Sequence, residues 1–200
     1  MIEDRHKKVF EVIERRQEGV IVLEDIHDPH NAAAVWRSCD GFGFQKVYLI
    51  FEKEKVFNPK KIGKASSSSA NKWLDFKVFK STKQCLEELK KDGYKIFATV
   101  LDKEAKNINK VDFKINKIAL MMGNEHQGLS ETAIKMANEK VYIPMKGMVQ
   151  SFNLSVTAAI VMYEVDRQRN NLPKSLSFGK RDFHLSEKEK EEIKKRWRYN

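Results

Sequence analysis

Short apolar runs alternate with polar loops and amphipathic segments along the chain. The runs are Val20–Leu23, Lys46–Phe51, Trp73–Phe79, Tyr94–Val100, Ile118–Met122 and Val141–Met145. Runs of this length, bounded by turn residues, are typical of buried strands. Helical patterns lie between several of them, so the sequence predicts β–loop–α–β units and an α/β fold with a parallel sheet.

Capping residues predict where the helices begin and end. Asn31 stands at an N-cap position before an alanine-rich segment that closes at Gly41 or Gly43. Ser81 and Gln84 fit a capping box for a helix that continues to about Lys91. A last long helix is expected from about Asn153 to Asn170, where Asn171-Leu172-Pro173 stops it.

The two ends of the chain are basic. A narrow apolar stripe predicts an amphipathic helix over residues 5–18 with Gly19 as its C-cap, and it is either a helix packed on the domain edge or an arm that contacts RNA. Ser186 and Glu189 offer a capping box for a charged helix near the carboxyl end. We therefore expect a basic helix at 1–18, one domain at 19–170 and a basic tail at 171–200.

Charge narrows the class of partner. The 200 residues carry a net charge of +10 with 33% charged residues, which favours a polyanion such as nucleic acid. Cys39 and Cys85 are the only cysteines, so a reducing cytoplasm is expected. The amino terminus lacks a signal-peptide pattern, no run is long enough for a membrane helix, and no metal-ligand spacing occurs.

A second basic segment follows the second predicted strand. Residues 51–69 contain five lysines and the serine run Ser66–Ser69. The lysines are Lys53, Lys55, Lys60, Lys61 and Lys64. This composition fits either a loop that binds phosphates or a plain surface linker.

Three polar constellations are candidates for chemistry, because nucleophile-elbow, Walker and GxGxxG patterns are absent. The first is Asn31 with Arg37, which is either a phosphate ligand or an ordinary helix arginine. The second is Gly123–Gly128, a tight turn in which Glu125 either orients the loop or is solvated. The third is Pro144–Leu154, where apolar side chains and backbone amides suit a flat adenine ring, or form a simple strand-to-helix loop.

Together, in this order and spacing, the three constellations resemble the motifs of the SpoU/TrmH family of SPOUT methyltransferases. The matching stretches are Asn31–Gly43 (NAAAVWRSCDGFG), Ile118–Ser130 (IALMMGNEHQGLS) and Ile143–Ser155 (IPMKGMVQSFNLS). The likeness covers roughly residues 18–168. It implies a Rossmann-like parallel sheet with helices on both faces and a deep trefoil knot in its carboxyl-terminal part, which periodicity alone does not reveal.

The resemblance also implies a cofactor, a partner and site residues. The methyl donor would be S-adenosyl-L-methionine, and the active form would be a homodimer without metal or membrane. Cofactor contacts fall on Val100, Leu101, Gly123, Ile143 and Phe152, with Met145 and Leu154 nearby. Catalytic roles fall on Asn31, Arg37, Glu125, Ser151 and Asn153. His30, Arg167 and Arg169 match positions that contact tRNA or support that contact.

The resemblance further implies the reaction, which is methylation of the ribose 2′-hydroxyl of the D-loop guanosine, position 18, of tRNA. A ribose hydroxyl is a weak nucleophile, so its proton must be removed or its oxygen polarised. Arg37 is either an unusual base or the group that positions a phosphate to accept the proton, since the pKa of a guanidinium exceeds about 12. The alternatives are a ribosomal RNA ribose as the substrate, or an RNA-binding module without catalysis.

Overall fold

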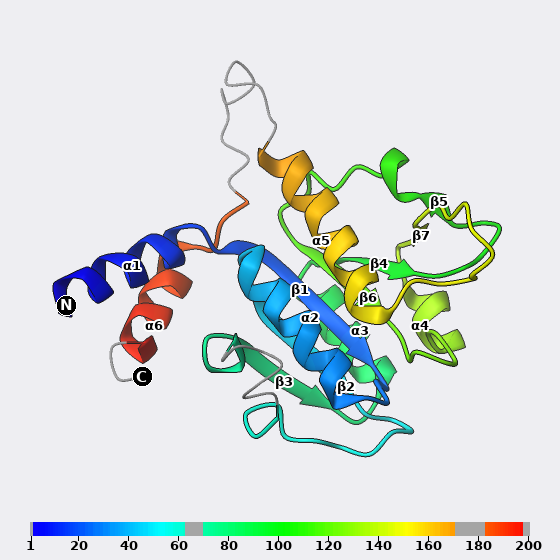
Figure 1. Cartoon of the computed structure of the whole chain (residues 1–200), viewed down its shortest axis with the longest axis horizontal. Coiled ribbons are helices and arrows are strands. Elements are labelled where there is room, and N and C mark those ends of the chain that lie inside the picture. Colours follow the sequence, from blue (N-terminus) through cyan, green and yellow to red (C-terminus); the bar gives the residue numbers. More distant parts are fainter. Residues whose placement is uncertain (1, 63–69, 171–182, 198–200) are drawn as a thin grey trace.

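The computed structural model describes residues 2–62, 70–170 and 183–197. A parallel seven-stranded sheet with the order β3-β2-β1-β6-β4-β7-β5 forms its centre (Figure 1). The strands are β1 (Gln17–Glu24), β2 (Phe44–Ile50), β3 (Asp75–Phe79), β4 (Lys95–Thr99), β5 (Lys106–Asn107), β6 (Ile118–Met122) and β7 (Glu139–Tyr142). Every ladder between neighbouring strands is parallel, so the predicted α/β class is confirmed.

Helices cover both faces of the sheet. The helices α2 (Pro29–Gly41) and α5 (Leu154–Asn170) pack on one face, where Ile21 and Leu23 of β1 point. The helices α3 (Thr82–Lys91) and α4 (Glu131–Met136) pack on the other, where Val20 and Val22 point. Because successive side chains of a strand face opposite ways, burial of both faces explains why β6 and residues Val20–Leu23 of β1 are continuous apolar runs.

The two ends of the chain meet beside the sheet. Helix α1 (Ile2–Glu14) lies next to α6 (Glu187–Trp197), and Ile13, Ile193 and Trp197 form a separate small core (Figure 1). The capping box at the start of α6 is confirmed, since the Ser186 amide donates to the Glu189 carboxylate at 3.0 Å. Short 3-10 turns, η1 (Ala70–Lys72) and η2 (Ile108–Lys110), complete the described elements.

The first helix ends earlier than its pattern predicts. Residues 5–18 were expected to be helical with Gly19 as the cap, but α1 stops at Glu14 and Gly19 lies inside β1. Tertiary contacts explain the difference: the Gln17 amide donates to the Gly43 carbonyl at 2.7 Å, and the Arg16 guanidinium reaches Asp40 at 2.6 Å. These bonds draw the segment into the sheet and override its helical periodicity.

The strand β7 is displaced from its predicted range Val141–Met145. It pairs with β4 from Glu139, whose carboxylate binds the Lys95 ammonium, and it ends at Tyr142. Pro144 has no amide hydrogen for a further ladder bond, which fits an end before it. The apolar residues after Tyr142 belong instead to the loop that precedes α5.

Parts of three predictions fall outside the described residues. These parts are Lys64 with the serine run Ser66–Ser69, the stop signal Asn171-Leu172-Pro173, and residues 171–182 and 198–200 of the predicted basic tail. Within the described ranges, no helix combines the length and apolarity needed to cross a membrane. In the same ranges, no group of three or more His, Cys, Asp or Glu side chains is arranged to hold a metal ion.

Candidate functional site at the carboxyl ends of the strands

A cavity of about 760 Å³ lies where β1, β4, β6 and β7 end. Its walls come from the loop after β4, the loop after β6, the loop between β7 and α5, and the first turn of α2. The carboxyl edge of a parallel sheet is the usual ligand position in α/β folds. The cavity therefore lies where the sequence predicted a site.

The predicted cofactor residues come together in this cavity. Its lining includes Val100, Leu101, Gly123, Ile143 and Phe152, and also Met145 and Leu154. Four of the predicted catalytic residues line it as well: Asn31, Glu125, Ser151 and Asn153. Residues from all three motifs thus share one space, although their individual roles stay predictions.

Asn31 is not the cap of α2, as its position had suggested. Asp28 is the N-cap, because its side chain accepts a hydrogen bond from the His30 amide at 2.8 Å, and Pro29 occupies the start of the helix. Asn31 instead lies in the first turn of α2, where it lines the cavity. It donates to Glu125 at 2.9 Å and accepts from Asn153 at 3.2 Å, which joins the three motifs.

Glu125 is the centre of this network. Its carboxylate accepts hydrogen bonds from the His27 amide at 3.0 Å and the Asp28 amide at 3.4 Å in addition to the Asn31 amide group. Burial alone raises the pKa of the Glu125 carboxyl, but these donors outweigh it and hold the pKa below its usual value. Glu125 is therefore a carboxylate that fixes the loop, and it is poorly suited to act as a base.

The loop after β6 is a closed turn that depends on glycine. Asn124 and Gly128 exchange two backbone hydrogen bonds, and Gly128 has a φ of 70°. A Cβ on Gly123 would lie 2.3 Å from the Gly128 carbonyl carbon, so only glycine fits. The Asn124 side chain accepts from the His126 and Gln127 amides and donates to the Asp25 carbonyl, which sets the turn against the end of β1.

Several lining residues carry no signal in the sequence. Thr99, Asp102, Gln150 and Thr157 face the same cavity, and Asp25 adopts a left-handed backbone with φ 49° beside it. Asp and Asn tolerate this conformation better than most residues, but an aspartate in a loop does not by itself indicate it. Asn124 belongs to the second predicted constellation but had no predicted role, because its burial and the hydrogen bonds of its side chain emerge only in three dimensions.

Arg37 and His30 lie outside the cavity lining. Arg37 is exposed on α2, almost two turns after Asn31, and none of the described residues forms a hydrogen bond or ion pair with its guanidinium. His30 is exposed in the first turn of the same helix. The structure of one chain thus separates the predicted catalytic arginine from the other four predicted catalytic residues.

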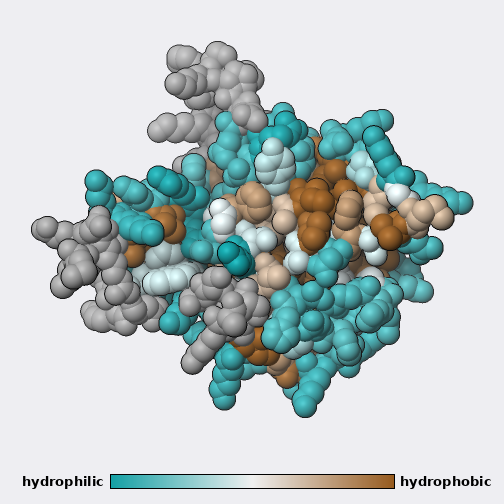
Figure 2. All heavy atoms as spheres, in the orientation of Figure 1, coloured by the Kyte–Doolittle hydropathy of each residue, from teal (hydrophilic) through white to brown (hydrophobic). Residues whose placement is uncertain are grey.

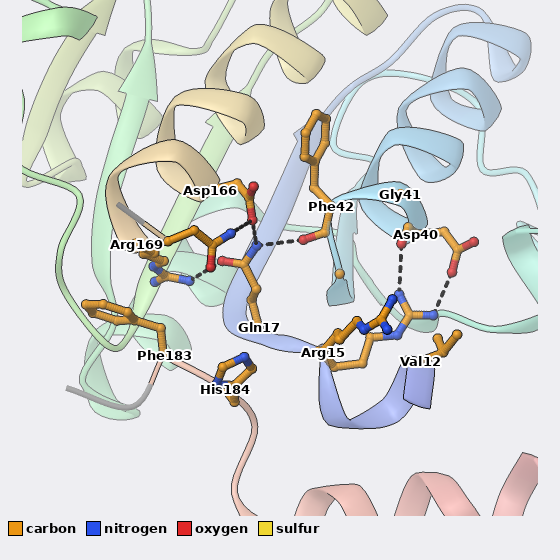
Figure 3. Close-up of a pocket in the computed structure, with 13 residues that line it drawn as sticks. Val12, Arg15, Gln17, Asp40, Gly41, Phe42, Asp166, Arg169, Phe183 and His184 are labelled. Carbon is orange, nitrogen blue, oxygen red and sulfur yellow. Dashed lines mark hydrogen bonds and ion pairs between the residues drawn. The ribbon is translucent and has the colours of Figure 1, made fainter. Parts of the chain in front are cut away.

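A second cavity, of about 480 Å³, lies at the amino ends of β1 and β2 (Figure 3). Arg169 borders it, but the guanidinium is buried and donates to the Gln17 side chain and to the carbonyls of Glu18, Ile115 and Asn116. Burial lowers the pKa of Arg169 to about 10, so it stays charged at neutral pH. Of the two suggested roles, this position supports the indirect one, because Arg169 braces the end of α5.

Arg167 differs from Arg169 in its surroundings. It is exposed at the side of α5 and pairs with the Glu164 carboxylate at 2.7 Å. The ion pair raises the pKa of Arg167 through the hydrogen bond from the guanidinium to Glu164. An exposed guanidinium held by one neighbour is available to a phosphate, so the structure is compatible with the predicted RNA contact.

The first cavity suits a ligand with a flat ring and a polar tail. Apolar side chains from Met122, Ile143 and Phe152 line it together with backbone from three loops. The network of Asn31, Glu125 and Asn153 supplies fixed hydrogen-bonding groups at one wall. Such a site can hold a nucleoside-type cofactor by shape and main-chain contacts.

Comparison with known proteins points in one direction. The profile of the SpoU rRNA Methylase family matches residues 18–163. The chain is 36% identical over 200 residues, all of this chain and 90% of the relative, to the tRNA (guanosine(18)-2'-O)-methyltransferase of Aquifex aeolicus (strain VF5). It is 35% identical over 170 residues, 84% of each chain, to the protein of the same name from Thermus thermophilus. The crystal structure of the A. aeolicus TrmH/SpoU tRNA modifying enzyme matches with a TM-score of 0.82 and 33% identity, and the match covers 99% of this chain and 96% of that one.

Proposed function

Because the chain belongs to the SpoU rRNA methylase family, we propose that it is a tRNA (guanosine(18)-2'-O)-methyltransferase that uses S-adenosyl-L-methionine. The likeness to the A. aeolicus structure over nearly the whole chain implies the SPOUT fold with its carboxyl-terminal knot. The single observation that carries the proposal is that residues of all three motifs line one cavity. The proposed substrate favours the cytoplasm, where the buried free thiols of Cys39 and Cys85 would stay reduced.

The cavity fits the proposed donor. The tight turn Gly123–Gly128 places backbone at the cavity wall, and apolar side chains of the loop between β7 and α5 offer a surface for the adenine ring. We assign the cofactor contacts to Val100, Leu101, Gly123, Ile143 and Phe152. When bound, S-adenosyl-L-methionine supplies an electrophilic methyl group on a sulfonium.

The residues of the chain then have to present a ribose oxygen to that methyl group. Arg37 would bind the 2′-hydroxyl and an adjacent phosphate, lowering the cost of losing the hydroxyl proton. Asn31, Ser151 and Asn153 would hold the RNA and the loop, and Glu125 would keep the motifs in register through its three donors. The ionised state of Glu125 fits this positioning role.

The position of Arg37 supports a homodimer in which each subunit completes the site of the other. Arg37 lies outside the cavity of its own chain. The neighbouring helix α5 exposes Val156 and Tyr163, and Figure 2 shows a hydrophobic area over α5. A second copy of the chain that packs on this area of α5 would bury Val156 and Tyr163. The same packing would bring Arg37 of one subunit to the cavity of the other.

Subunit mixing tests the shared site. Arg37→Ala leaves the cavity intact, while Phe152→Arg places a long charged side chain inside the cofactor cavity. If Arg37 acts in the partner's site, each mixed dimer regains one complete site, and an equal mixture recovers about a quarter of the wild-type rate. If Arg37 and the cavity of the same subunit act together, or if the protein sediments as a monomer, the mixture stays inactive. Either result would contradict a site shared between two subunits.

Transfer of a labelled methyl group tests the substrate. The proposal predicts incorporation into an unmodified tRNA transcript and none into ribosomal RNA fragments of similar length. Preference for ribosomal RNA would support the alternative substrate within the same family. Tight tRNA binding without transfer, together with no heat on titration with S-adenosyl-L-methionine, would instead support an RNA-binding module.

A further inference from the structure

The lysine-rich loop after β2 has no role in the function proposed above. Its described part, residues 51–62, leaves the carboxyl end of β2, so it begins at the same edge of the sheet as the cavity. It exposes four lysines, and none of them pairs with a carboxylate among the described residues. They are Lys53, Lys55, Lys60 and Lys61.

The beginning of this loop is bonded to the end of β1. The Asp25 carboxylate accepts hydrogen bonds from three successive amides, those of Glu52 at 2.8 Å, Lys53 at 2.9 Å and Glu54 at 3.1 Å. Asp25 reaches them from a left-handed backbone, which costs free energy for a residue with a side chain. Because the Asp25 carbonyl also accepts from Asn124, one residue fixes both this loop and the turn that carries Glu125.

The far part of the loop, residues 59–62, is also hydrogen-bonded to the rest of the chain. Asn71 is buried, and its side-chain amide donates to the carbonyls of Pro59, Lys60 and Ile62 at 3.0 to 3.4 Å. Between the two anchors, the Phe57 ring packs on Phe51 with 4.8 Å between ring centroids. Residues 51–62 are therefore fixed at both ends by hydrogen bonds and do not form a plain linker.

The acidic residues of the loop are already engaged. Glu52 accepts a hydrogen bond from the Thr82 amide at 2.9 Å, and Glu54 faces the His27 ring at 3.3 Å. His27 in turn donates its amide to Glu125, so the loop is in contact with the cavity network. The loop thus presents unpaired cations while its carboxylates are used internally, a pattern that suits phosphate groups.

We propose that residues 51–62 form an RNA-contact surface on which the four lysines bind phosphates of the RNA that carries the target ribose. The inference rests on the proposed function and adds a surface to it. A braced backbone loses less conformational entropy on binding than a free one, which explains why the chain maintains the strained Asp25 and the buried Asn71. Contacts of this kind fix the position of an RNA without reading its sequence.

Binding of an unmodified tRNA transcript to the full chain tests the surface, with Lys60→Ala/Lys61→Ala compared to Lys90→Ala/Lys91→Ala. Both pairs are adjacent exposed lysines, but the control pair lies at the end of α3. The loop variant should weaken binding and lower the slope of log Kd against log salt by about 2, one for each lost phosphate contact. The control pair should leave the slope unchanged, and both variants should bind S-adenosyl-L-methionine as the wild type does.

A second pair of variants tests whether the Asp25 carboxylate must hold the loop for tRNA to bind. Asp25→Gly keeps the left-handed backbone but removes the acceptor for three amides, whereas Asp25→Asn keeps an acceptor oxygen. Asp25→Gly should weaken tRNA binding, and Asp25→Asn should bind tRNA about as tightly as the wild type.

The RNA-contact surface would be wrong, and the proposed function untouched, if Lys60→Ala/Lys61→Ala kept the wild-type affinity and salt slope. An equal loss of affinity in Lys90→Ala/Lys91→Ala would have the same meaning. A wild-type protein that binds no tRNA would overturn the proposed function along with the RNA-contact surface.

Discussion

At the residue scale, a few polar side chains hold the three motif loops together. Asn31 and Glu125 come from different motifs, and their bond at 2.9 Å closes the cavity wall. Asn153 joins from the third motif at 3.2 Å. Amides and a carboxylate suit this role because each offers more than one hydrogen bond in a fixed geometry.

Glu125→Gln should weaken cofactor binding and show how much the ionised carboxylate of Glu125 stabilises the fold. Glutamine keeps one acceptor oxygen, but its NH2 group would face either the His27 amide or the donors of Asp28 and Asn31. We therefore expect cofactor affinity to fall by about tenfold, the equivalent of one charged hydrogen bond. Because the pKa of Glu125 is lowered in the fold, its stabilising effect is complete above the unfolded-state pKa of about 4.3. It is lost as the pH falls through the lower, folded-state pKa.

Denaturation of wild type and Glu125→Gln across a pH series measures this effect. The difference in their free energies of unfolding should stay constant from pH 8 to about 5 and narrow below about 4. A difference that stays constant into stronger acid would show that the ionised carboxylate contributes nothing to the fold.

Arg37→Ala should remove turnover and keep the cofactor. We expect kcat to fall by about 100-fold, as for the loss of one charged donor at a reacting oxygen. Binding of S-adenosyl-L-methionine should be unchanged, because Arg37 does not line the cavity. Arg37→Lys should recover little, since an ammonium cannot bridge a hydroxyl and a phosphate as a guanidinium does. Near-normal turnover in Arg37→Ala would exclude the residue from the chemistry.

Comparison of Arg169→Met with Arg167→Met tests whether the buried Arg169 stabilises the fold more than the exposed Arg167 does. Loss of Arg169 leaves buried carbonyls without donors and should cost about 3 kcal/mol in the free energy of unfolding. Arg167→Met removes only a partly exposed ion pair and should cost less than about 1 kcal/mol. Urea denaturation measures both, and equal costs would contradict the structural role of Arg169.

At the element scale, apolar runs identified the sheet better than they located its ends. The run Ile118–Met122 coincides with β6 because both of its faces are buried, while Val141–Met145 overshot β7 beyond Tyr142. Residues 15–18 were placed in a helix because the bonds of Arg16 and Gln17 to distant residues leave no local pattern. The order of the strands and the shared cavity likewise arise from long-range packing.

Trp197 connects the last helix, α6, to parts of the chain outside α1. The Trp197 ring lies 5.0 Å from the Trp73 ring and 5.2 Å from the Arg16 guanidinium, measured between centroids and to the guanidinium carbon. Trp197→Ala should speed amide hydrogen exchange in residues 187–197 and leave exchange in β1 unchanged. Unchanged exchange in α6 would show that other contacts, such as Lys190 with Glu14, suffice to hold it.

At the scale of the whole molecule, the active unit is proposed to be a dimer through α5. Val156 on α5 and Val78 on β3 have nearly equal exposed fractions, 44% and 43%, so they form a matched pair. Val156→Glu should produce monomers by analytical ultracentrifugation and abolish turnover, because a charge would be buried in the apolar contact. Val78→Glu should do neither, and a dimeric, active Val156→Glu would place the interface elsewhere.

The most direct measurement compares two tRNAs that differ at one oxygen. One carries guanosine at position 18 and the other 2′-deoxyguanosine, and both are incubated with the protein and S-adenosyl-L-methionine before mass mapping of the nucleosides. We expect one 2′-O-methylguanosine, at position 18, in the first tRNA and no methyl group in the second. Methylation of the deoxy substrate, or of another nucleotide in the first, would contradict the proposed function.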